Sequence, residues 1–298
     1  MSSSTLAPPN SISVEPAKVP TPPASDTPAP STPARQRTRV LAGRVGNGGK
    51  WLLRSSVVLA ALVAFWEVAP RLGLVDRTFL PEFSSVIGAL GDAAASGQLQ
   101  EHIWASVSRA VQGFVVAVII AVPLGIAIGW YKPVAQYLNP ALELFRNTAA
   151  LALLPVFVLI LGIGETSKVA LVIYACVFPI LLNTISGVRN VDPLLIKSAR
   201  SLGLPAWRLF QKVVLPAALP TIFTGIRLAA AASILVLIAA EMVGARSGLG
   251  YWIMASQLNF QIPQMYAGIV TIALVGLVFN LVLVTIERRF SRWRVPSN

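Results

Sequence analysis

The stretch Val107–Tyr131 reads VSRAVQGFVVAVIIAVPLGIAIGWY and decides the fold class. A helix needs about 20 apolar residues, within a range of about 17–25, to cross the hydrocarbon core of a bilayer. This run is long and apolar enough to cross as a single helix. It therefore predicts a membrane-spanning segment, and the rest of the chain can be tested for others of the same kind.

Five further apolar runs accompany this one. Together the six runs cover residues 55–70, 107–131, 148–163, 168–187, 219–242 and 266–286. The fifth and sixth are also long enough to cross directly. The first and third are short, and we expect them to extend through less apolar flanks, from Trp51 and from Leu138. The pattern predicts an all-α membrane protein with six transmembrane helices.

The composition agrees with this fold class. Of the 298 residues, 55% are apolar and 12% are charged, and the mean hydropathy is +0.70. Soluble domains are about 45–50% apolar and roughly 25% charged. The net charge of +12 lies mainly in the tails and short connections, as cytoplasmic loops require, so we expect membrane lipid and not nucleic acid as the partner of these basic residues. The single cysteine, Cys176, and the single histidine, His102, taken to lie outside any span, indicate no metal site.

Residues 1–50 form a separate region. Up to Ala34 this region is dominated by Pro, Ser, Thr and Ala, so it cannot bury enough apolar surface to offset the entropy of ordering. A basic stretch then precedes the first apolar run; it comprises Arg35, Arg37, Arg39, Arg44, Lys50 and Arg54. The sequence predicts a disordered cytoplasmic tail at 1–50 and a transmembrane domain at 51–298.

The charges of the connections predict the orientation. The first connection, 71–106, carries more acidic than basic residues, which suits the outside. The fourth connection, 188–218, carries five basic residues against Asp192 alone, and the C-terminal run 288–294 is basic, which suits the inside. Six spans that start inside return the chain to the inside, so we expect a multi-pass protein of the cytoplasmic membrane with both termini in the cytoplasm.

The fourth connection contains the most informative segment, Lys197–Pro216, which reads KSARSLGLPAWRLFQKVVLP. It predicts two short helical pieces separated at Gly203–Pro205, because glycine permits a positive φ and proline can open the second piece. Trp207, Phe210 and Val214 then fall on one apolar stripe. Such a hairpin is suited to docking into a groove of a partner, but it would equally suit an interfacial helix lying on the bilayer.

The same segment resembles the cytoplasmic signature of ABC-importer permeases, which is Glu-Ala-Ala, three residues, Gly, nine residues, Ile, one residue and Leu-Pro. Ala199, Gly203, Val213 and the pair Leu215–Pro216 are in register. Ser198 replaces an alanine, and Lys197 stands where the pattern has glutamate. The resemblance implies a coupling hairpin between spans 4 and 5 that contacts an ATPase through Lys197, Ser198, Ala199, Gly203, Trp207, Phe210, Leu215 and Pro216.

Three other segments are similar to the nitrate/sulfonate/taurine subfamily of these permeases. They are Arg146–Pro155 with Gly162–Glu165, Ala240–Met242 with Ser247–Tyr251, and Glu287–Phe290 with Arg292–Arg294. The resemblance covers about residues 104–294. It implies a transport subunit, not an enzyme, that imports a small anion, with aliphatic sulfonate or taurine ahead of nitrate. It also implies a second permease subunit, most simply a second copy, two cytoplasmic ATPase subunits and an extracytoplasmic binding protein. ATP and Mg²⁺ would be bound by the ATPase, with no cofactor on this chain.

Polar residues inside the expected spans are candidates for the substrate pathway, because ionisable groups are costly in a membrane. Arg146 in a third helix begun at Leu138 would meet an anion, or would instead reach the surface or pair with Glu143. Glu241 near the outer end of the fifth span would bond the backbone or line an outer gate. Asn183 and Thr184 would line the pathway or form interhelical hydrogen bonds.

Two other functional classes compete with the importer hypothesis. An intramembrane hydrolase would need paired aspartates or histidines inside the spans, and Asp76, Asp92 and Asp192 lie in the connections. A self-sufficient channel or secondary transporter would need no ATPase. We find no inverted repeat of the kind common in secondary transporters.

Overall fold

The computed structural model describes residues 57–290. The chain divides into two compact units, Met1–Leu59 and Ala60–Asn298. Of the first unit only residues 57–59 are described, and they are helical. The second unit begins with helical residues 60–71. The predicted disordered tail lies outside the described residues and stays a prediction.

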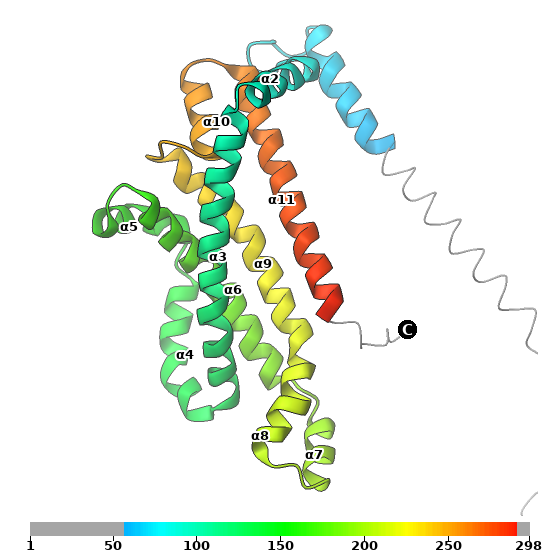
Figure 1. Ribbon diagram of the computed structural model, residues 1–298, viewed down its shortest axis with the longest axis vertical. Helices are drawn as coiled ribbons and strands as arrows, with labels where there is room; N and C mark the ends of the chain where they lie inside the picture. The colour runs from blue at the N-terminus through cyan, green and yellow to red at the C-terminus, as the bar shows by residue number, and fades with distance from the viewer. Residues whose placement is uncertain (1–56, 291–298) are drawn as a thin grey trace, which may run out of the picture. The chain divides into compact units, whose positions relative to one another are not determined.

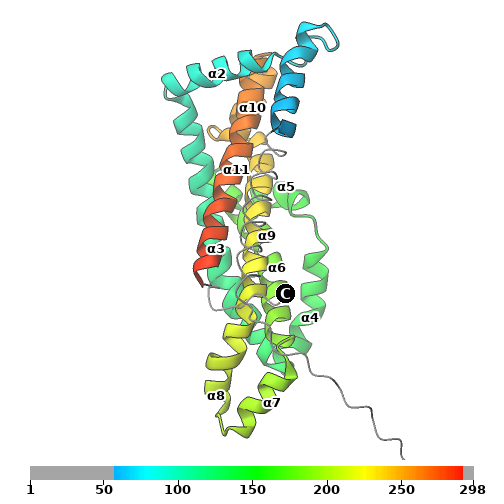
Figure 2. The same cartoon turned by 90° about the vertical axis from the view of Figure 1, so that its right-hand side faces the viewer.

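Every regular element among residues 57–290 is helical, as predicted. The elements are α2 (Phe83–Ala95), α3 (Gln98–Trp130), α4 (Lys132–Arg146), η1 (Ala150–Leu153), α5 (Leu154–Leu161), α6 (Glu165–Arg189), α7 (Pro193–Ser201), α8 (Ala206–Leu209), η2 (Phe210–Val214), α9 (Leu215–Met242), α10 (Leu249–Leu258) and α11 (Ile262–Phe290). Within the second unit, α2 and α10 lie at one end and α7 and α8 at the other (Figures 1 and 2). We call these the α10 end and the α8 end.

Four of these helices are long and apolar enough to cross a membrane. They are Gln98–Trp130, Glu165–Arg189, Ala206–Met242 and Ile262–Arg289, which match the second, fourth, fifth and sixth predicted runs. The third predicted run is instead built from η1 and α5, of 4 and 8 residues, and is too short to cross alone. The first predicted run begins outside the described residues. The structure therefore has four clear spans and shorter apolar helices.

The long helices α3 and α9 both pack along α6 (Figure 2). On α3, Gly113, Ala117, Ala121, Gly125 and Gly129 recur every fourth residue and form a small-residue face. A Cβ atom on Gly125 would come within 2.7 Å of Thr184 Cβ, so the two backbones approach more closely than larger residues allow. Small residues permit this approach where no hydrophobic effect drives helices together. Gly125 and Gly129 therefore allow α3 to pack closely against α6.

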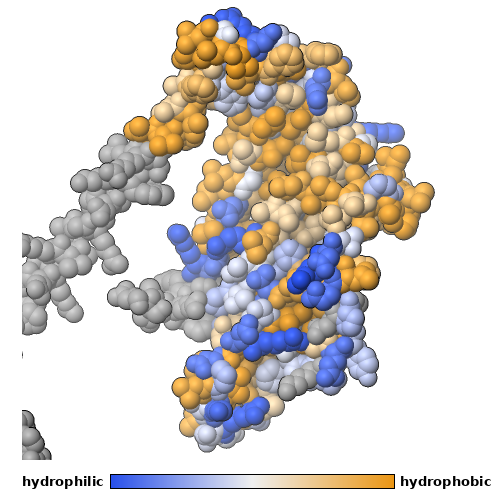
Figure 3. Space-filling view, turned by 180° about the vertical axis from the view of Figure 1, so that it is seen from behind, coloured by the Kyte–Doolittle hydropathy of each residue, from blue (hydrophilic) through white to orange (hydrophobic). Residues whose placement is uncertain are grey.

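The outer surface of the long helices is apolar. Ile119 of α3 and Val278 of α11 are large and exposed, as are many of their neighbours. Figure 3 shows apolar side chains over much of the upper part of the molecule and more hydrophilic side chains toward the α8 end. An exposed apolar surface of this extent is expected of helices that face lipid or a partner subunit.

Candidate functional site

The third predicted span is interrupted where its polar residues lie. We expected a continuous helix from Leu138, but α4 ends at Arg146 and η1 begins only at Ala150. Asn147 Nδ2 donates to the Glu143 carbonyl at 2.9 Å, and Thr148 Oγ1 donates to the Leu144 carbonyl at 3.2 Å. Side-chain bonds of this kind compete with the helical ladder for backbone groups. Non-helical backbone at membrane depth is tolerated only where protein covers it or where it lines a water-filled cavity.

A cavity of about 340 Å³ lies at this break. It is lined from the break by Arg146, Thr148 and Ala150, and from α6 and α9 by Tyr174, Ala175, Phe178, Pro179, Leu182, Ala232 and Val236. The Tyr174 hydroxyl donates to the Phe145 carbonyl at 2.9 Å. The Arg146 guanidinium lies 3.2 Å from the Glu143 carboxylate, the pairing that the sequence offered as one alternative. Arg146 remains 45% exposed, so it can still meet a solute.

The other polar pathway candidates lie in helix packing and not in the cavity lining. Asn183 Nδ2 donates to the Pro179 carbonyl at 2.8 Å, and Thr184 Oγ1 donates to the Ile180 carbonyl at 2.7 Å. Both bonds return to the same helix, α6, and do not cross to a neighbour. Thr184 is fully buried where α6 approaches Gly125 of α3. The structure thus places Arg146 at the cavity and separates it from Asn183, Thr184 and Glu241.

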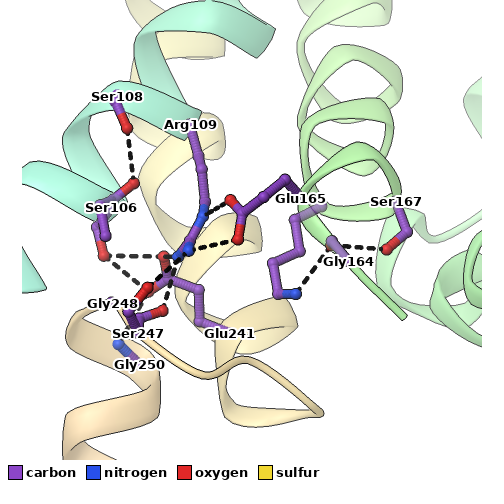
Figure 4. Close-up of polar contacts among 12 residues, drawn as sticks. Ser106, Ser108, Arg109, Gly164, Glu165, Ser167, Glu241, Ser247, Gly248 and Gly250 are labelled. Carbon is purple, nitrogen blue, oxygen red and sulfur yellow. Dashed lines mark hydrogen bonds and ion pairs between the residues drawn. The ribbon is translucent and has the colours of Figure 1, made fainter. Parts of the chain in front are cut away.

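Glu241 belongs to a buried ionic network near the α10 end (Figure 4). Its carboxylate is fully buried and lies 2.6 Å from Nη1 of Arg109, which is itself 4% exposed. Arg109 also pairs with Glu165 at the start of α6, and its Nη2 donates to Glu165 Oε1 at 2.7 Å. Ser247 accepts from Arg109 through both its carbonyl, at 2.7 Å, and its hydroxyl, at 3.0 Å. One guanidinium thereby joins α3, α6 and the α9–α10 connection.

The start of α10 supplies further donors to the network. Gly250 N donates to Glu241 Oε2 at 3.0 Å, and the Ser106 hydroxyl donates to the same atom at 2.7 Å. The backbone nitrogens at a helix N-terminus have no intrahelical acceptor, so a carboxylate there is favourable. Gly248 has φ +120, and a Cβ atom on it would come within 2.4 Å of the Glu241 carboxylate. The chain can close around Glu241 only because this position is glycine.

Sequence reasoning missed Arg109, although a usable signal was present. Arg109 is a lone charge near the start of the run that decided the fold, and an ionisable residue within a span is a functional-site hypothesis by default. His102 was placed outside the spans, but it lies in α3, where its Nδ1 accepts from Gly248 N at 3.3 Å. Arg109 and Glu241 are 132 residues apart, and no spacing pattern in the sequence predicts that they pair.

At the opposite end the predicted hairpin is present. α7 ends at Ser201 and α8 begins at Ala206, and Gly203 between them has φ +75, so the predicted left-handed turn is confirmed. Ala199 and Leu209 are buried, while Lys197 and Ser198 are exposed. The helix then continues as Ala206–Met242 through the π-helical turn η2. Pro216 lacks the N–H that would bond the carbonyl four residues earlier, and such positions commonly deform a helix.

The predicted apolar stripe of the hairpin is divided by the fold. Phe210 packs edge to face on Trp130 of α3, with ring centroids 5.1 Å apart, and Val214 is buried. Trp207 stacks on Phe210 but stays 67% exposed, and Leu202 is 80% exposed. The apolar surface that the hairpin leaves exposed therefore lies at its tip, while Phe210 anchors the hairpin to α3.

Comparisons with known proteins decide the family. Residues 121–294 match the family described as binding-protein-dependent transport system inner membrane component. The chain belongs to this family. It is 35% identical over 242 residues to the aliphatic sulfonates transport permease protein SsuC of Bacillus subtilis, a match that covers 81% of this chain and 88% of that protein. It is 33% identical over 254 residues to the taurine transport system permease protein TauC of Escherichia coli, with 82% and 92% covered.

The fold of this permease also has solved counterparts. A chain of the MetNI methionine ABC transporter, in an inward-facing conformation, superposes with a TM-score of 0.56 at 17% identity, covering 63% of this chain and 93% of that one. At this identity the likeness concerns the fold alone. The family match and the permease relatives make the protein an inner-membrane, multi-pass permease component of an ABC transporter, as the sequence predicted.

Proposed function

We propose that this permease imports a small sulfonate, either an aliphatic sulfonate or taurine. The observation that carries the proposal is its similarity to SsuC and TauC over about four-fifths of the chain. The cavity at the helix break suits such a solute, because it combines the Arg146 cation and the Tyr174 and Thr148 hydroxyls with an apolar wall. Arginine presents a planar fork of donors to oxyanions. The alternative cargoes are nitrate and small organic solutes other than sulfonates.

The proposed topology has six spans with both termini in the cytoplasm. The basic hairpin residues Lys197, Arg200 and Arg208 favour placing the α8 end inside, and the acidic 71–106 connection favours placing the α10 end outside. Two crossings are added in this proposal to the four clear spans. One is the first predicted run, and the other is α4 together with the short η1–α5 segment. The latter crosses as a broken helix beside the cavity.

The hairpin is the proposed docking site for the ATPase. Its tip exposes Leu202 and Trp207 beside the basic side chains, and an exposed tryptophan is a common anchor of protein interfaces. A complete importer would then comprise two permease subunits, most simply two copies of this chain, two cytoplasmic ATPases that bind ATP and Mg²⁺, and an extracytoplasmic binding protein. Lys197 stands where the signature of ABC-importer permeases has glutamate. Docking here therefore relies on shape and apolar contact more than on an ion pair at that position.

A direct mechanical route connects the hairpin to the cavity. The helix Ala206–Met242 begins in the hairpin and carries the cavity residues Ala232 and Val236 near its other end. In the proposed cycle, ATP binding draws the two hairpins together and tilts this helix with them, which closes the cavity from the α8 end and opens it toward the α10 end. Hydrolysis and product release reset the arrangement.

Reconstitution tests the proposal. Proteoliposomes containing the permease, its ATPase and its binding protein should accumulate radiolabelled taurine or ethanesulfonate when ATP is enclosed, and nitrate should compete weakly. The Arg146→Gln variant should lose most of this uptake, whereas Glu143→Gln, which removes only the partner of Arg146, should retain it. Uptake by the permease alone would instead establish a channel or secondary transporter, and accumulation of nitrate without sulfonate would overturn the proposed cargo.

A further inference from the structure

Two cationic side chains are buried beside one exposed carboxylate near the α10 end. Arg109 and Lys168 are each 4% exposed, while the side chain of Glu165 is 66% exposed. The Lys168 ammonium donates to the Gly164 carbonyl at 2.9 Å, and among residues 57–290 it has no carboxylate within ion-pair distance. Buried charges are costly unless they are paired, so a nine-tenths buried lysine with one neutral acceptor is a group that an anion would stabilise.

The Arg109 guanidinium has two edges in different surroundings. Nη1 faces the fully buried Glu241 carboxylate and the Ser247 carbonyl. The Nε and Nη2 edge faces the two oxygens of Glu165, in the fork arrangement that carboxylates, sulfonates and phosphates share. The Glu165 side chain is 66% exposed, whereas the Glu241 side chain is fully buried.

We propose that the Nε–Nη2 edge of Arg109, together with the Lys168 ammonium, forms an entry subsite for a sulfonate, which Glu165 occupies as an internal ligand until the substrate displaces it. The identity of the anion as a sulfonate rests on the proposed function. The exchange leaves the charge of the site unchanged, because one monoanionic group replaces another. The displaced carboxylate is not stranded, since it is already two-thirds exposed.

The subsite is aligned with the cavity at the helix break. Lys168, Ala175 and Leu182 are seven residues apart on α6 and therefore share one face, and the last two line the cavity. A small apolar cluster of Leu154, Leu171, Val236 and Ala240 brings α5 against α6 and α9, and its member Val236 also lines the cavity. In this proposal the solute meets the cationic subsite first, then passes the apolar cluster, and reaches the cavity that Arg146 lines.

Direct binding to the assembled importer tests this subsite. We would embed the complex of permease and ATPase in nanodiscs without the binding protein and measure equilibrium binding of radiolabelled ethanesulfonate. Glu165→Gln removes the competing internal ligand, so it should bind ethanesulfonate roughly tenfold more tightly than the unaltered complex, the scale of one charge-assisted hydrogen-bonding pair. Adding Lys168→Met to this variant should cancel the gain. The matched control is Glu101→Gln, an exposed glutamate in the first turn of α3, which should change nothing.

The outcomes separate this inference from the proposed function. If Glu165→Gln binds no better than the unaltered complex while that complex still imports taurine, the subsite is refuted and the importer stands. If Glu165→Gln gains affinity for ethanesulfonate but the complete importer takes up no sulfonate, the subsite stands and the proposed cargo is wrong. Because Glu165 is exposed, this variant is expected to fold, and the comparison with Glu101→Gln remains decisive even if the Lys168→Met variant misfolds.

Discussion

The two ends of the permease use charge in opposite ways. Near the α10 end, Arg109 and Glu241 are buried and every donor of the guanidinium is used, so the charges hold α3, α6 and the α9–α10 connection to one another. At the α8 end, the charged residues of the hairpin are exposed, and the turn at Gly203 makes no close contact. Removing a residue should therefore change folding at one end and assembly at the other.

This difference matches what each end is proposed to do. An importer must keep its helices in register on the side where the solute enters, because a loose entry would leak. On the ATPase side it must offer a surface that another protein can grip. Buried ion pairs are costly to break, and exposed apolar tips are available for contact. The variants below test this contrast from the largest expected effect to the smallest.

The largest effect is expected for Glu241→Ala. This change leaves Arg109 without its buried partner and also removes the acceptor of Ser106 and Gly250. Breaking one half of a buried pair typically costs about 3–5 kcal/mol. Thermal unfolding of the purified permease in nanodiscs should show a strongly lowered midpoint. Glu165→Gln is the matched control, because it removes the exposed partner of the same arginine and should cost at most about 1 kcal/mol. If both variants lost the same amount of stability, Glu241 could not be the fixed partner of Arg109 and Glu165 its displaceable one.

The next largest effect is expected for Gly250→Ala. A Cβ atom here would lie 2.3 Å from the Ile238 carbonyl and 2.8 Å from Glu241 Cβ, so α10 would have to move off α9. Overpacking of this kind typically costs about 1–3 kcal/mol, and contact with backbone favours the upper end. The same unfolding measurement should show no loss for Gly276→Ala in α11, where a Cβ atom meets nothing within 4 Å. A harmless Gly250→Ala would show that the α9–α10 junction is looser than its contacts indicate.

The contrast between the ends also explains what the sequence could predict. The long apolar runs and the hairpin follow from local rules, namely span length, helix periodicity and the φ > 0 turn at Gly203, and these were confirmed. The continuous third span was wrong, because the side chains of Asn147 and Thr148 bond back to carbonyls of α4 and the chain then restarts as η1. Average hydropathy over 148–163 carries no information about such a local competition.

The ionic network could not be predicted because its partners meet only in the folded chain. Glu241 was identified as a costly residue, but its partner Arg109 lies on another helix, and Glu165 begins a third. Likewise Asn183 and Thr184 look like pathway residues by polarity, yet both bond within α6. The packing of side chains, such as Thr184 against Gly125, determines which face of a helix contacts its neighbour. This packing cannot be deduced from a single sequence.

At the α8 end, Trp207→Ala should affect assembly and not folding. Trp207 is 67% exposed, so its loss should change the free energy of unfolding by no more than about 0.5 kcal/mol. As an interface anchor it should contribute about 2 kcal/mol, and the affinity for the ATPase should fall roughly thirtyfold in a titration of nanodisc-embedded permease. Trp104→Ala is the control, since Trp104 is 74% exposed on α3 near the other end and should leave ATPase affinity unchanged. Equal affinities for the two variants would place the ATPase contact elsewhere.

The smallest effect is expected for Gly203→Ala, and it asks whether the hairpin must keep its shape to transmit force. The φ of +75 costs an alanine about 1 kcal/mol, while the open space around the position removes any steric component. The strain falls on the turn alone, so the spans should unfold as before and the ATPase should still bind. ATP hydrolysis should continue while taurine uptake per ATP decreases, because a turn that relaxes toward negative φ no longer holds α7 rigidly against α8. Gly88→Ala, at an exposed and unstrained position in the interior of α2, should leave that ratio unchanged. An unaltered ratio in Gly203→Ala would mean that force passes to α9 through Phe210 and the continuous helix Ala206–Met242 alone, and that α7 serves only to hold the ATPase.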